Sequence, residues 1–172
     1  MTSTPSKVSL RAIEPEDLDL LYRIENDRNL WNVGTTNVPY SRYTLHDYIA
    51  NASDDIYADR QVRMMVENAS GEIVGIVDIV NFDPGHRRAE VGLIILNKYR
   101  RQGYGCSTLE AIADYALRIL HLHQLFAFVD SNNVASLQLF KKMGYHESAR
   151  IVDWLYDGCN YHDAIVMQFV FS

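Results

Sequence analysis

The chain has 172 residues, of which 48% are hydrophobic and 22% are charged, a composition typical of one ordinary folded domain. A net charge of −6 and a sequence pI of about 5.4 argue against nucleic acid or an anionic membrane as the main partner. The chain begins without an apolar signal core and has no apolar run long enough to span a bilayer, so we expect a cytoplasmic protein.

The first half of the chain is predicted to hold two helices and four strands. Short or alternating apolar runs bounded by turn residues indicate the strands, and Pro15 with neighbouring acids indicates the first turn of a helix. The predicted elements are a strand at Lys7–Ile13, a helix from Glu14 to about Asn26, an irregular aromatic loop at 28–43, a helix at Leu45–Ala52, and strands at Val62–Glu67, Ile73–Phe82 and Arg88–Leu96.

In the second half, apolar residues recurring every three or four positions predict two further helices, and Gly144 suits the position just after a helix end. The predicted elements are a helix at 106–120, a strand at Leu125–Val129, a helix at Asn133–Met143, and strands at Tyr145–Leu155 and Tyr161–Phe171. The order βααβββαβαββ predicts a single α/β (α+β) domain over 7–172, after a flexible tail at 1–6. Its sheet is expected to be mixed and mostly antiparallel, with helices on both faces.

A basic stretch with two glycines, residues 97–108, lies between a predicted strand and a predicted helix. Glycines let the backbone turn tightly with its N–H groups exposed, and a helix N-terminus adds free donors and the positive end of the helix dipole. Three cations, Lys98, Arg100 and Arg101, stand at its entrance. The stretch therefore predicts a site for a phosphate-bearing ligand.

Other phosphate and metal motifs fit this chain less well. The P-loop pattern is absent, and a dinucleotide fingerprint beginning at Gly103 fails at its last position, Thr108. Asp130 lies where a ribose-binding acid belongs, which keeps nucleotide binding as an alternative, although a strand that closes a meander does not suit a doubly wound sheet. The cysteines and histidines show no zinc spacing, so no metal site is predicted.

Two motifs together carry a family resemblance. The first, Arg100-x-x-Gly103-x-Gly105, matches the pattern Q/R-x-x-G-x-G/A, and the second, Asn133 to Tyr145, matches N-x-x-(A/S)-x-x-x-(Y/F)-x-K-x-G-(F/Y). With these motifs in order, residues 7–171 resemble the Gcn5-related N-acetyltransferase (GNAT) superfamily. Within it, the chain resembles the branch of spermidine/spermine and ribosomal-protein N-acetyltransferases, less clearly before residue 60.

This resemblance implies acetyl-CoA as cofactor and direct attack of an amine in a ternary complex, without a covalent enzyme intermediate. It also implies that the fourth strand splays from the fifth and that the pantetheine arm lies between them as an extra strand. The implied cofactor-binding residues are Ile94, Ile95 and Leu96 along the arm, Arg100, Arg101, Gln102, Gly103, Tyr104, Gly105, Cys106 and Ser107 around the pyrophosphate, and Asn133, Ser136 and Lys142 on the next helix.

Two positions bear on catalysis. Glu90 lies where the family often has a carboxylate base; an ordinary carboxylate is a poor direct base for an ammonium group, which favours a water relay or charge attraction. Glu90 can equally be a hydrogen-bonded surface residue. Phe140 occupies the position from which a tyrosine protonates the leaving thiolate in many members, and phenylalanine has no proton to give. Water, Tyr145, Tyr104 or Cys106 would then have to supply it.

The predicted acceptor-binding residues are Glu25, Asp27, Trp31 and Tyr40. Aromatic rings in this region can hold an alkylammonium group by cation–π contact, or can simply pack within their loop. We expect the acceptor to be a primary amine, with a polyamine-like small molecule preferred over a peptide N-terminus. Because of Phe140, an acyl-CoA-binding sensor with weak catalysis is the alternative. A homo-oligomer fits the resemblance.

Overall fold

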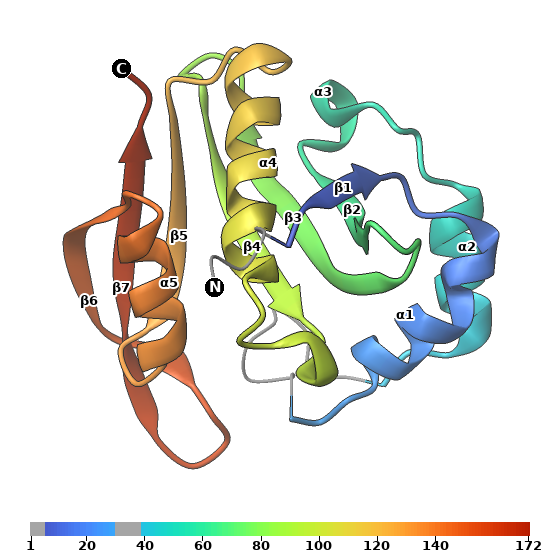
Figure 1. Cartoon of the computed structure of the whole chain (residues 1–172). Coiled ribbons are helices and arrows are strands. Elements are labelled where there is room, and N and C mark those ends of the chain that lie inside the picture. The colour runs from blue at the N-terminus through green and yellow to red at the C-terminus, as the bar shows by residue number, and fades with distance from the viewer. Residues whose placement is uncertain (1–5, 30–38) are drawn as a thin grey trace, which may run out of the picture.

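The computed structural model describes residues 6–29 and 39–172, and its centre is a seven-stranded sheet (Figure 1). The strands are β1 (Val8–Arg11), β2 (Val62–Asn68), β3 (Ile73–Asp83), β4 (Arg88–Ile95), β5 (Gln124–Asp130), β6 (His146–Tyr156) and β7 (Tyr161–Val170). Their order is β1-β2-β3-β4-β5-β7-β6, and β4 and β5 form the parallel pair in an otherwise antiparallel sheet. The predicted mixed sheet is confirmed.

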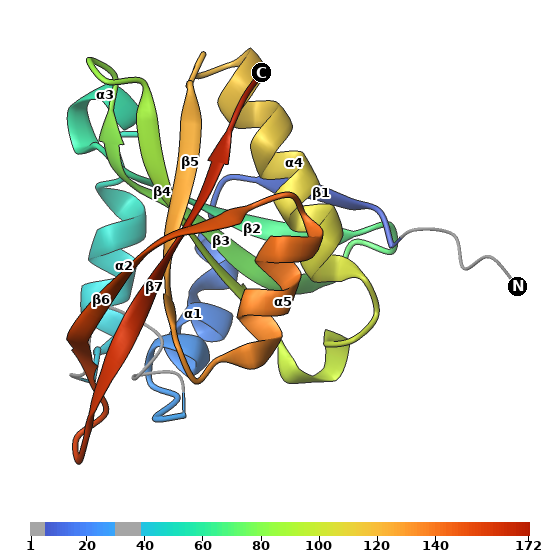
Figure 2. The same ribbon diagram turned by 90° about the vertical axis from the view of Figure 1, so that its left-hand side faces the viewer.

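Helices cover both faces of the sheet (Figure 2). The helices are α1 (Leu18–Glu25), α2 (Arg42–Ala50), α3 (Ile56–Asp59), α4 (Tyr104–Arg118) and α5 (Val134–Lys142), with short 3-10 turns η1 (Pro15–Asp17) and η2 (Asn97–Tyr99). Adjacent residues of β2 show how the layers form: Val66 joins the core under α4 and α5, whereas Met65 joins the core under α1 and α2. Because successive side chains of a strand point to opposite faces of the sheet, β2 contributes to two hydrophobic cores, one on each face.

Several element boundaries differ from the predictions because capping residues decide them. The α2 helix begins at Arg42 rather than Leu45, since the Ser41 hydroxyl accepts a hydrogen bond from the Thr44 N–H at 3.0 Å. The α4 helix begins two residues early because Gly103, at φ 87°, serves as its N-cap. The short α3 helix, capped by Asp55, was not predicted, because four residues are too few to show a helical period.

The predicted tail is partly fixed. Residues 1–5 lie outside the described residues, but the Ser6 hydroxyl donates a hydrogen bond to the Gln102 carbonyl at 2.5 Å. The first residue of β1 is also held in place, because the Val8 N–H donates a hydrogen bond to the Ser107 hydroxyl at 3.2 Å. The start of β1 therefore lies against the loop that leads into α4.

The feature of the fold that positions the candidate site is the separation of β4 from β5. Their pairing consists of Arg88 with Gln124, Ala89 with Leu125, and Glu90 with Phe126. Beyond Glu90 the two strands diverge (Figure 1), although β4 stays paired with β3 and β5 stays paired with β7. Each strand thus presents an unpaired edge to the gap, in agreement with the splay that the resemblance implies.

Candidate active site

The loop between β4 and α4 offers free backbone donors. Arg101, at φ 59°, and Gly103 both adopt left-handed backbone conformations, which turn the chain sharply into the helix. Within the described part of the chain, no backbone N–H group of residues 101–106 has a hydrogen-bond acceptor. Such donors at a helix N-terminus are suited to hold phosphate oxygens.

Side chains of the same loop fix its shape. Arg100 Nε donates to the Ile95 carbonyl at 3.0 Å, and Gln102 Nε2 donates to the Lys98 carbonyl at 2.8 Å. The Tyr104 ring packs edge-on against another ring, that of Tyr99, with centroids 5.8 Å apart. The cationic side chains of this loop remain exposed at the surface, where they can approach a phosphate group.

The second motif lies beside the first. The Asn133 side chain caps α5 by accepting a hydrogen bond from the Ser136 N–H at 3.1 Å. Leu139, further along α5, packs on the first turn of α4, where a Cβ atom added at Gly105 would lie 3.0 Å from Leu139 Cδ2. Lys142 follows three residues after Leu139 and therefore lies on the same side of the helix. The two predicted motifs thus meet at the start of α4.

The main chain of β4 alternates between β3 and the gap. The Leu96 N–H donates to the Val74 carbonyl at 2.9 Å, toward β3. Because successive residues of a strand point their main-chain groups to opposite sides, those of Val91, Leu93 and Ile95 face the gap. Of the three residues predicted along the cofactor arm, only Ile95 turns its backbone there. Val91 and Leu93 were not predicted.

Glu90 lies at the last β4–β5 pair, where the gap opens. Its neighbours Ala89 and Val91 both point into the core under α4 and α5, so the Glu90 side chain points to the opposite face. Asn81 Nδ2, from a bulge in β3, donates a hydrogen bond to Glu90 Oε2 at 2.7 Å. Burial raises the pKa of Glu90, and the hydrogen bond from Asn81 opposes that rise.

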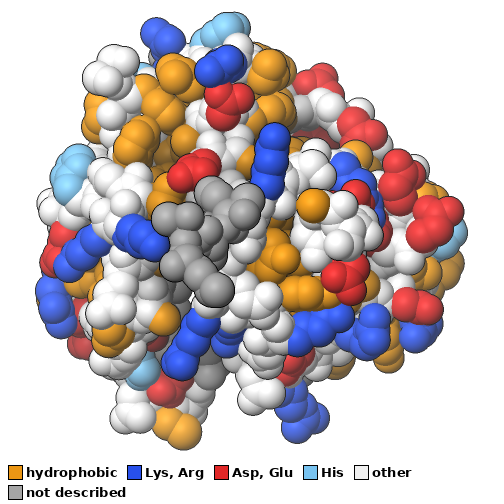
Figure 3. Space-filling model, in the orientation of Figure 1, with side chains coloured by type: hydrophobic (Ala, Val, Ile, Leu, Met, Phe, Trp, Pro, Cys, Tyr) orange, Lys and Arg blue, Asp and Glu red, His pale blue; other side chains and the backbone are white. Residues whose placement is uncertain are grey.

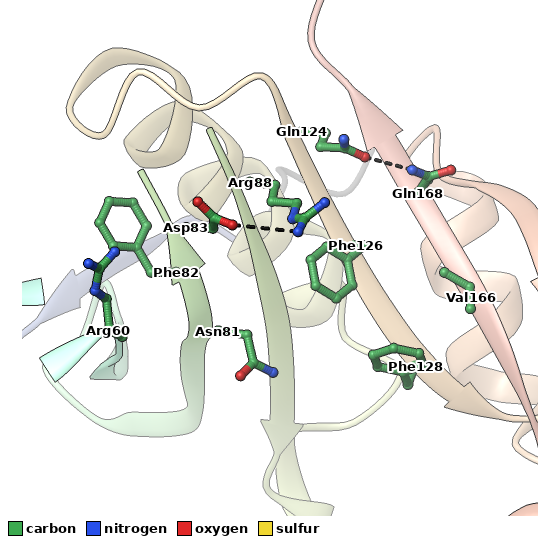
Figure 4. A pocket seen from close by; sticks show the side chains of 10 residues that line it. All are labelled: Arg60, Asn81, Phe82, Asp83, Arg88, Gln124, Phe126, Phe128, Val166 and Gln168. Atoms are coloured by element: carbon green, nitrogen blue, oxygen red, sulfur yellow. Dashed lines mark hydrogen bonds and ion pairs between the residues drawn. The ribbon is translucent and has the colours of Figure 1, made fainter. Parts of the chain in front are cut away.

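A cavity of about 830 Å³ lies on the Glu90 side of the sheet (Figure 4), a size suited to a small ligand. Its lining side chains come from β3, β4, β5 and β7 and from the end of α3: Arg60, Asn81, Phe82, Asp83, Arg88, Gln124, Phe126, Phe128, Val166 and Gln168. Asn81 both lines the cavity and binds Glu90, so the Glu90 carboxylate lies at the cavity's edge. Asn81 was not predicted, because only the register shift in β3 brings it to Glu90.

Phe140 is buried in the core and packs edge-on against Tyr145, with ring centroids 4.9 Å apart. The Tyr145 hydroxyl is buried and has no hydrogen-bond partner among the described residues. Burial raises the pKa of Tyr145, which makes its hydroxyl a weaker acid than that of an exposed tyrosine. The structure therefore offers Tyr145 beside the position where the family has its acid.

The predicted acceptor-binding residues have different surroundings. The Glu25 carboxylate forms an ion pair with Arg63, which also binds Asp78 through two hydrogen bonds. Asp27 accepts hydrogen bonds from Asn29, and the backbone of Tyr40 is held by the Asn26 side chain. Trp31 lies outside the described residues. The acceptor role of all four remains a prediction.

Asp130 Oδ2 lies 3.0 Å from His162 Nδ1, so this carboxylate is already engaged. Among the described residues no group of three or more His, Cys, Asp or Glu could hold a metal ion. No helix of the described chain is long and apolar enough to cross a bilayer. Figure 3 shows Lys and Arg side chains interspersed with Asp and Glu over one face.

The comparison with known families decides the assignment. Residues 7–146 match the family described as "Acetyltransferase (GNAT) domain". The chain belongs to the GNAT acetyltransferase family. Members of this family use acetyl-CoA.

Similar proteins agree with this assignment. The chain is 26% identical to spermidine N(1)-acetyltransferase of Vibrio cholerae over 158 residues, covering 92% of this chain and 90% of that one. It is 25% identical to a putative ribosomal N-acetyltransferase of Bacillus subtilis, covering 92% and 88%. A crystal structure of the Vibrio cholerae spermidine enzyme in complex with CoA and spermine superimposes with a TM-score of 0.85 at 25% identity, covering 95% of each chain.

The described residues of this GNAT acetyltransferase suit CoA. Free amides and exposed cations stand at the start of α4, and an unpaired strand edge leads from there to Glu90. When bound, acetyl-CoA supplies an acetyl group activated as a thioester. The residues around the gap would hold its pyrophosphate and its pantetheine arm.

Replacing Gly103 with alanine is expected to weaken acetyl-CoA binding about tenfold, because a side chain disfavours φ 87° and turns the loop amides away from the phosphates. Isothermal titration with acetyl-CoA measures the change. Gly71→Ala is the matched control, since Gly71 also has a positive φ, 79°, and has nothing within 4 Å of an added Cβ. Equal affinities in the two variants would contradict the assignment of the loop.

Proposed function

We propose that this chain transfers the acetyl group of acetyl-CoA to a primary amine by direct attack, with both substrates bound and without a covalent enzyme intermediate. The observation that carries the proposal is the position of Glu90. Its carboxylate lies at the edge of a cavity and at the point where β4 and β5 separate. The acetyl donor and the amine can thus approach this point from opposite faces of the sheet.

Each group around this point has a part in the reaction. The amides of residues 101–106 hold the donor's phosphates, and the free edge of β4 pairs with its pantetheine arm. An N–H group of Val91 or Leu93 donates to the acetyl carbonyl and stabilises the negative charge that develops there. Glu90, acting through water, accepts the proton that the attacking ammonium group must lose. Its raised pKa brings it closer to the acceptor's pKa than an ordinary carboxylate.

The acceptor in this proposal is a small primary amine. The names of the relatives support a polyamine such as spermidine, which is also the sequence prediction. The relative named as a putative ribosomal N-acetyltransferase supports the second candidate, a protein N-terminus. A cytoplasmic location is part of the proposal, because acetyl-CoA must be available to the enzyme.

Release of free CoA thiol from acetyl-CoA, measured with a panel of amines, tests the proposal. Spermidine, amino acids and peptides with free N-termini are the main arms, and thermal stabilisation by acetyl-CoA alone is measured beside them. Turnover with any amine supports the reaction. Stabilisation without turnover by any amine would instead favour an acyl-CoA-binding sensor, the reading that Phe140 suggests.

Replacing Phe140 with tyrosine is expected to raise kcat about tenfold, because a positioned hydroxyl can protonate the leaving thiolate. Steady-state CoA release measures the effect. Phe169→Tyr is the matched control, since Phe169 also contacts the Tyr145 ring, at 5.3 Å, but comes from β7. If Tyr145 supplies the proton in the natural chain, Tyr145→Phe lowers kcat and Phe140→Tyr restores it. A kcat unchanged by Phe140→Tyr would show that protonation of the thiolate does not limit the reaction.

A further inference from the structure

We propose that the acceptor carries an anionic group as well as its amine, and that Arg88 binds this group in the cavity beside Glu90, with the positive charge of Arg60 at the cavity's edge adding to the attraction. This inference rests on the proposed function and names the substrate class. It selects an amino-acid-like amine over a polyamine. The argument comes from the charges that line the cavity and from what already neutralises them.

The cavity lining has more positive than negative charge. Arg60, Arg88 and Asp83 are its charged side chains, and the other lining residues are amides or apolar groups. Figure 4 shows Arg88 beside Asp83 in the upper part of the view, Arg60 at the left edge of the cavity on the far side of Phe82, and Asn81 and Phe128 lower down. Two cations against one carboxylate disfavour a ligand whose far end is another ammonium group.

The charges of the arginines are not balanced within the described chain. Arg88 Nη2 lies 3.5 Å from Asp83 Oδ2, a long contact between side chains that are 48% and 34% exposed. Asp83 also accepts a hydrogen bond from the His86 N–H at 2.9 Å. The Arg60 side chain is exposed and has no ion-pair partner within residues 6–29 and 39–172. The two guanidinium groups thus retain donors for an anion.

The spacing along β4 suits a ligand with two ends. Arg88 and Glu90 are two residues apart, so they lie on one face of the strand with their Cα atoms about 7 Å apart. Phe126, paired with Glu90, and Phe128 line the apolar wall of the same cavity. A ligand with its amine at Glu90 and its anionic group near Arg88 would therefore place a short hydrocarbon chain against these rings.

The carboxylates nearest the predicted acceptor residue Glu25 already have a cationic partner. Asp78 and Glu25 both bind Arg63, so neither carboxylate is free of a cationic partner. The connection at 28–41, which contains two of the predicted acceptor residues, holds Arg28 as its one charged residue. A polycation would need several carboxylates along its length, whereas the described cavity supplies Glu90 at its edge and Asp83, which lies beside Arg88.

Three amines of equal length test the inference, because they differ only at the far end. They are 4-aminobutyrate, 1-aminobutane and 1,4-diaminobutane, which carry a carboxylate, a methyl group and an ammonium group. Their affinities for the CoA-saturated protein are measured by calorimetry, and CoA release from acetyl-CoA is measured separately. Two further amines are included: 2-aminoethyl phosphate shows whether a phosphate can replace the carboxylate, and spermidine shows whether a polyamine binds.

We expect 4-aminobutyrate to bind about tenfold more tightly than 1-aminobutane, and 1,4-diaminobutane to bind most weakly. Arg88→Glu should reverse this order, and Arg60→Gln should reduce the preference. Arg118→Gln is the matched control, because Arg118 is an exposed residue of α4 paired with Asp114 and lies outside the cavity lining.

The outcomes separate this inference from the proposed function. Equal or tighter binding of 1,4-diaminobutane or spermidine in the natural chain overturns the inference, whether or not acetyl transfer occurs. An anion preference that is lost in Arg88→Glu but kept in Arg118→Gln supports it. If that preference is found but no amine in either panel releases CoA, the cavity binds an anionic amine but the acetyl transfer proposed for it fails.

Discussion

Replacing Glu90 with glutamine is expected to lower kcat/KM for acetyl transfer about 100-fold while leaving acetyl-CoA binding unchanged. Glutamine keeps the size of the side chain and can still pair with Asn81, but it cannot accept a proton. The Glu90 side chain points away from α4 and α5, so its loss leaves the phosphate loop intact. CoA release and calorimetry with acetyl-CoA measure the two properties separately.

The pH dependence gives this prediction a second readout. Burial raises the pKa of Glu90, and only the ionised form accepts a proton, so kcat/KM is expected to rise with pH through that raised pKa. Glu90→Gln should remove this acid limb. Asn81→Gly should instead move the limb to higher pH, because it removes the hydrogen bond that favours the carboxylate. Glycine suits this position, where φ is 49°.

Glu90→Gln should lower the activity without lowering the stability of the fold. A carboxyl group whose pKa is raised by folding stabilises the fold when protonated, and this contribution is lost as pH rises through the folded pKa. At neutral pH the Glu90 carboxylate therefore costs stability, and Glu90→Gln should melt no lower than the natural chain. Glu110→Gln, at an exposed position of α4, is the control. A slow variant that also melts much lower would point to a structural role for Glu90.

Elements with a clear apolar period could be predicted from the sequence, and so could the loop that joins β4 to α4. The α4 helix repeats apolar residues such as Leu109, Ile112 and Ala116, all buried, over four turns. In the loop before α4, the groups suited to bind phosphate belong to consecutive residues. Its free amides follow from glycine and from the start of a helix, both of which are local properties.

The surroundings of Glu90 and the cavity beside it could not be predicted, because they depend on contacts between distant segments. Asn81 meets Glu90 only through the bulge that shifts the β3–β4 register. Arg60 joins the cavity because its carbonyl accepts a hydrogen bond from the Phe82 N–H at 3.0 Å, which fixes the end of α3 beside β3. The ion pair between Glu25 and Arg63 could not be predicted either, since no local pattern shows that these two residues are partners.

Replacing Gly75 with alanine is expected to destabilise the fold by about 3 kcal/mol and to abolish the stabilisation by acetyl-CoA. A Cβ atom at Gly75 would lie 2.3 Å from the Ile94 carbonyl oxygen and 3.0 Å from Ile95 Cδ1. The carbonyl belongs to the backbone of β4 and cannot move without the strand. Gly75 is thus required where β3 passes closest to β4.

The displacement should reach the candidate site, because Gly75 pairs with Ile95 at the end of β4 that borders the gap. Thermal melting should fall by roughly 6–12 °C, the scale that 3 kcal/mol implies for a chain of this length. Gly92→Ala is the matched control on the neighbouring strand β4, where an added Cβ would make an ordinary contact of 3.9 Å with Asp78 Cβ. Both alanines remove a glycine from a strand, so a loss of acetyl-CoA stabilisation confined to Gly75→Ala would link the position of β4, rather than strand flexibility, to cofactor binding. Retention of that stabilisation in a folded Gly75→Ala protein would show that the gap edge of β4 does not hold the cofactor.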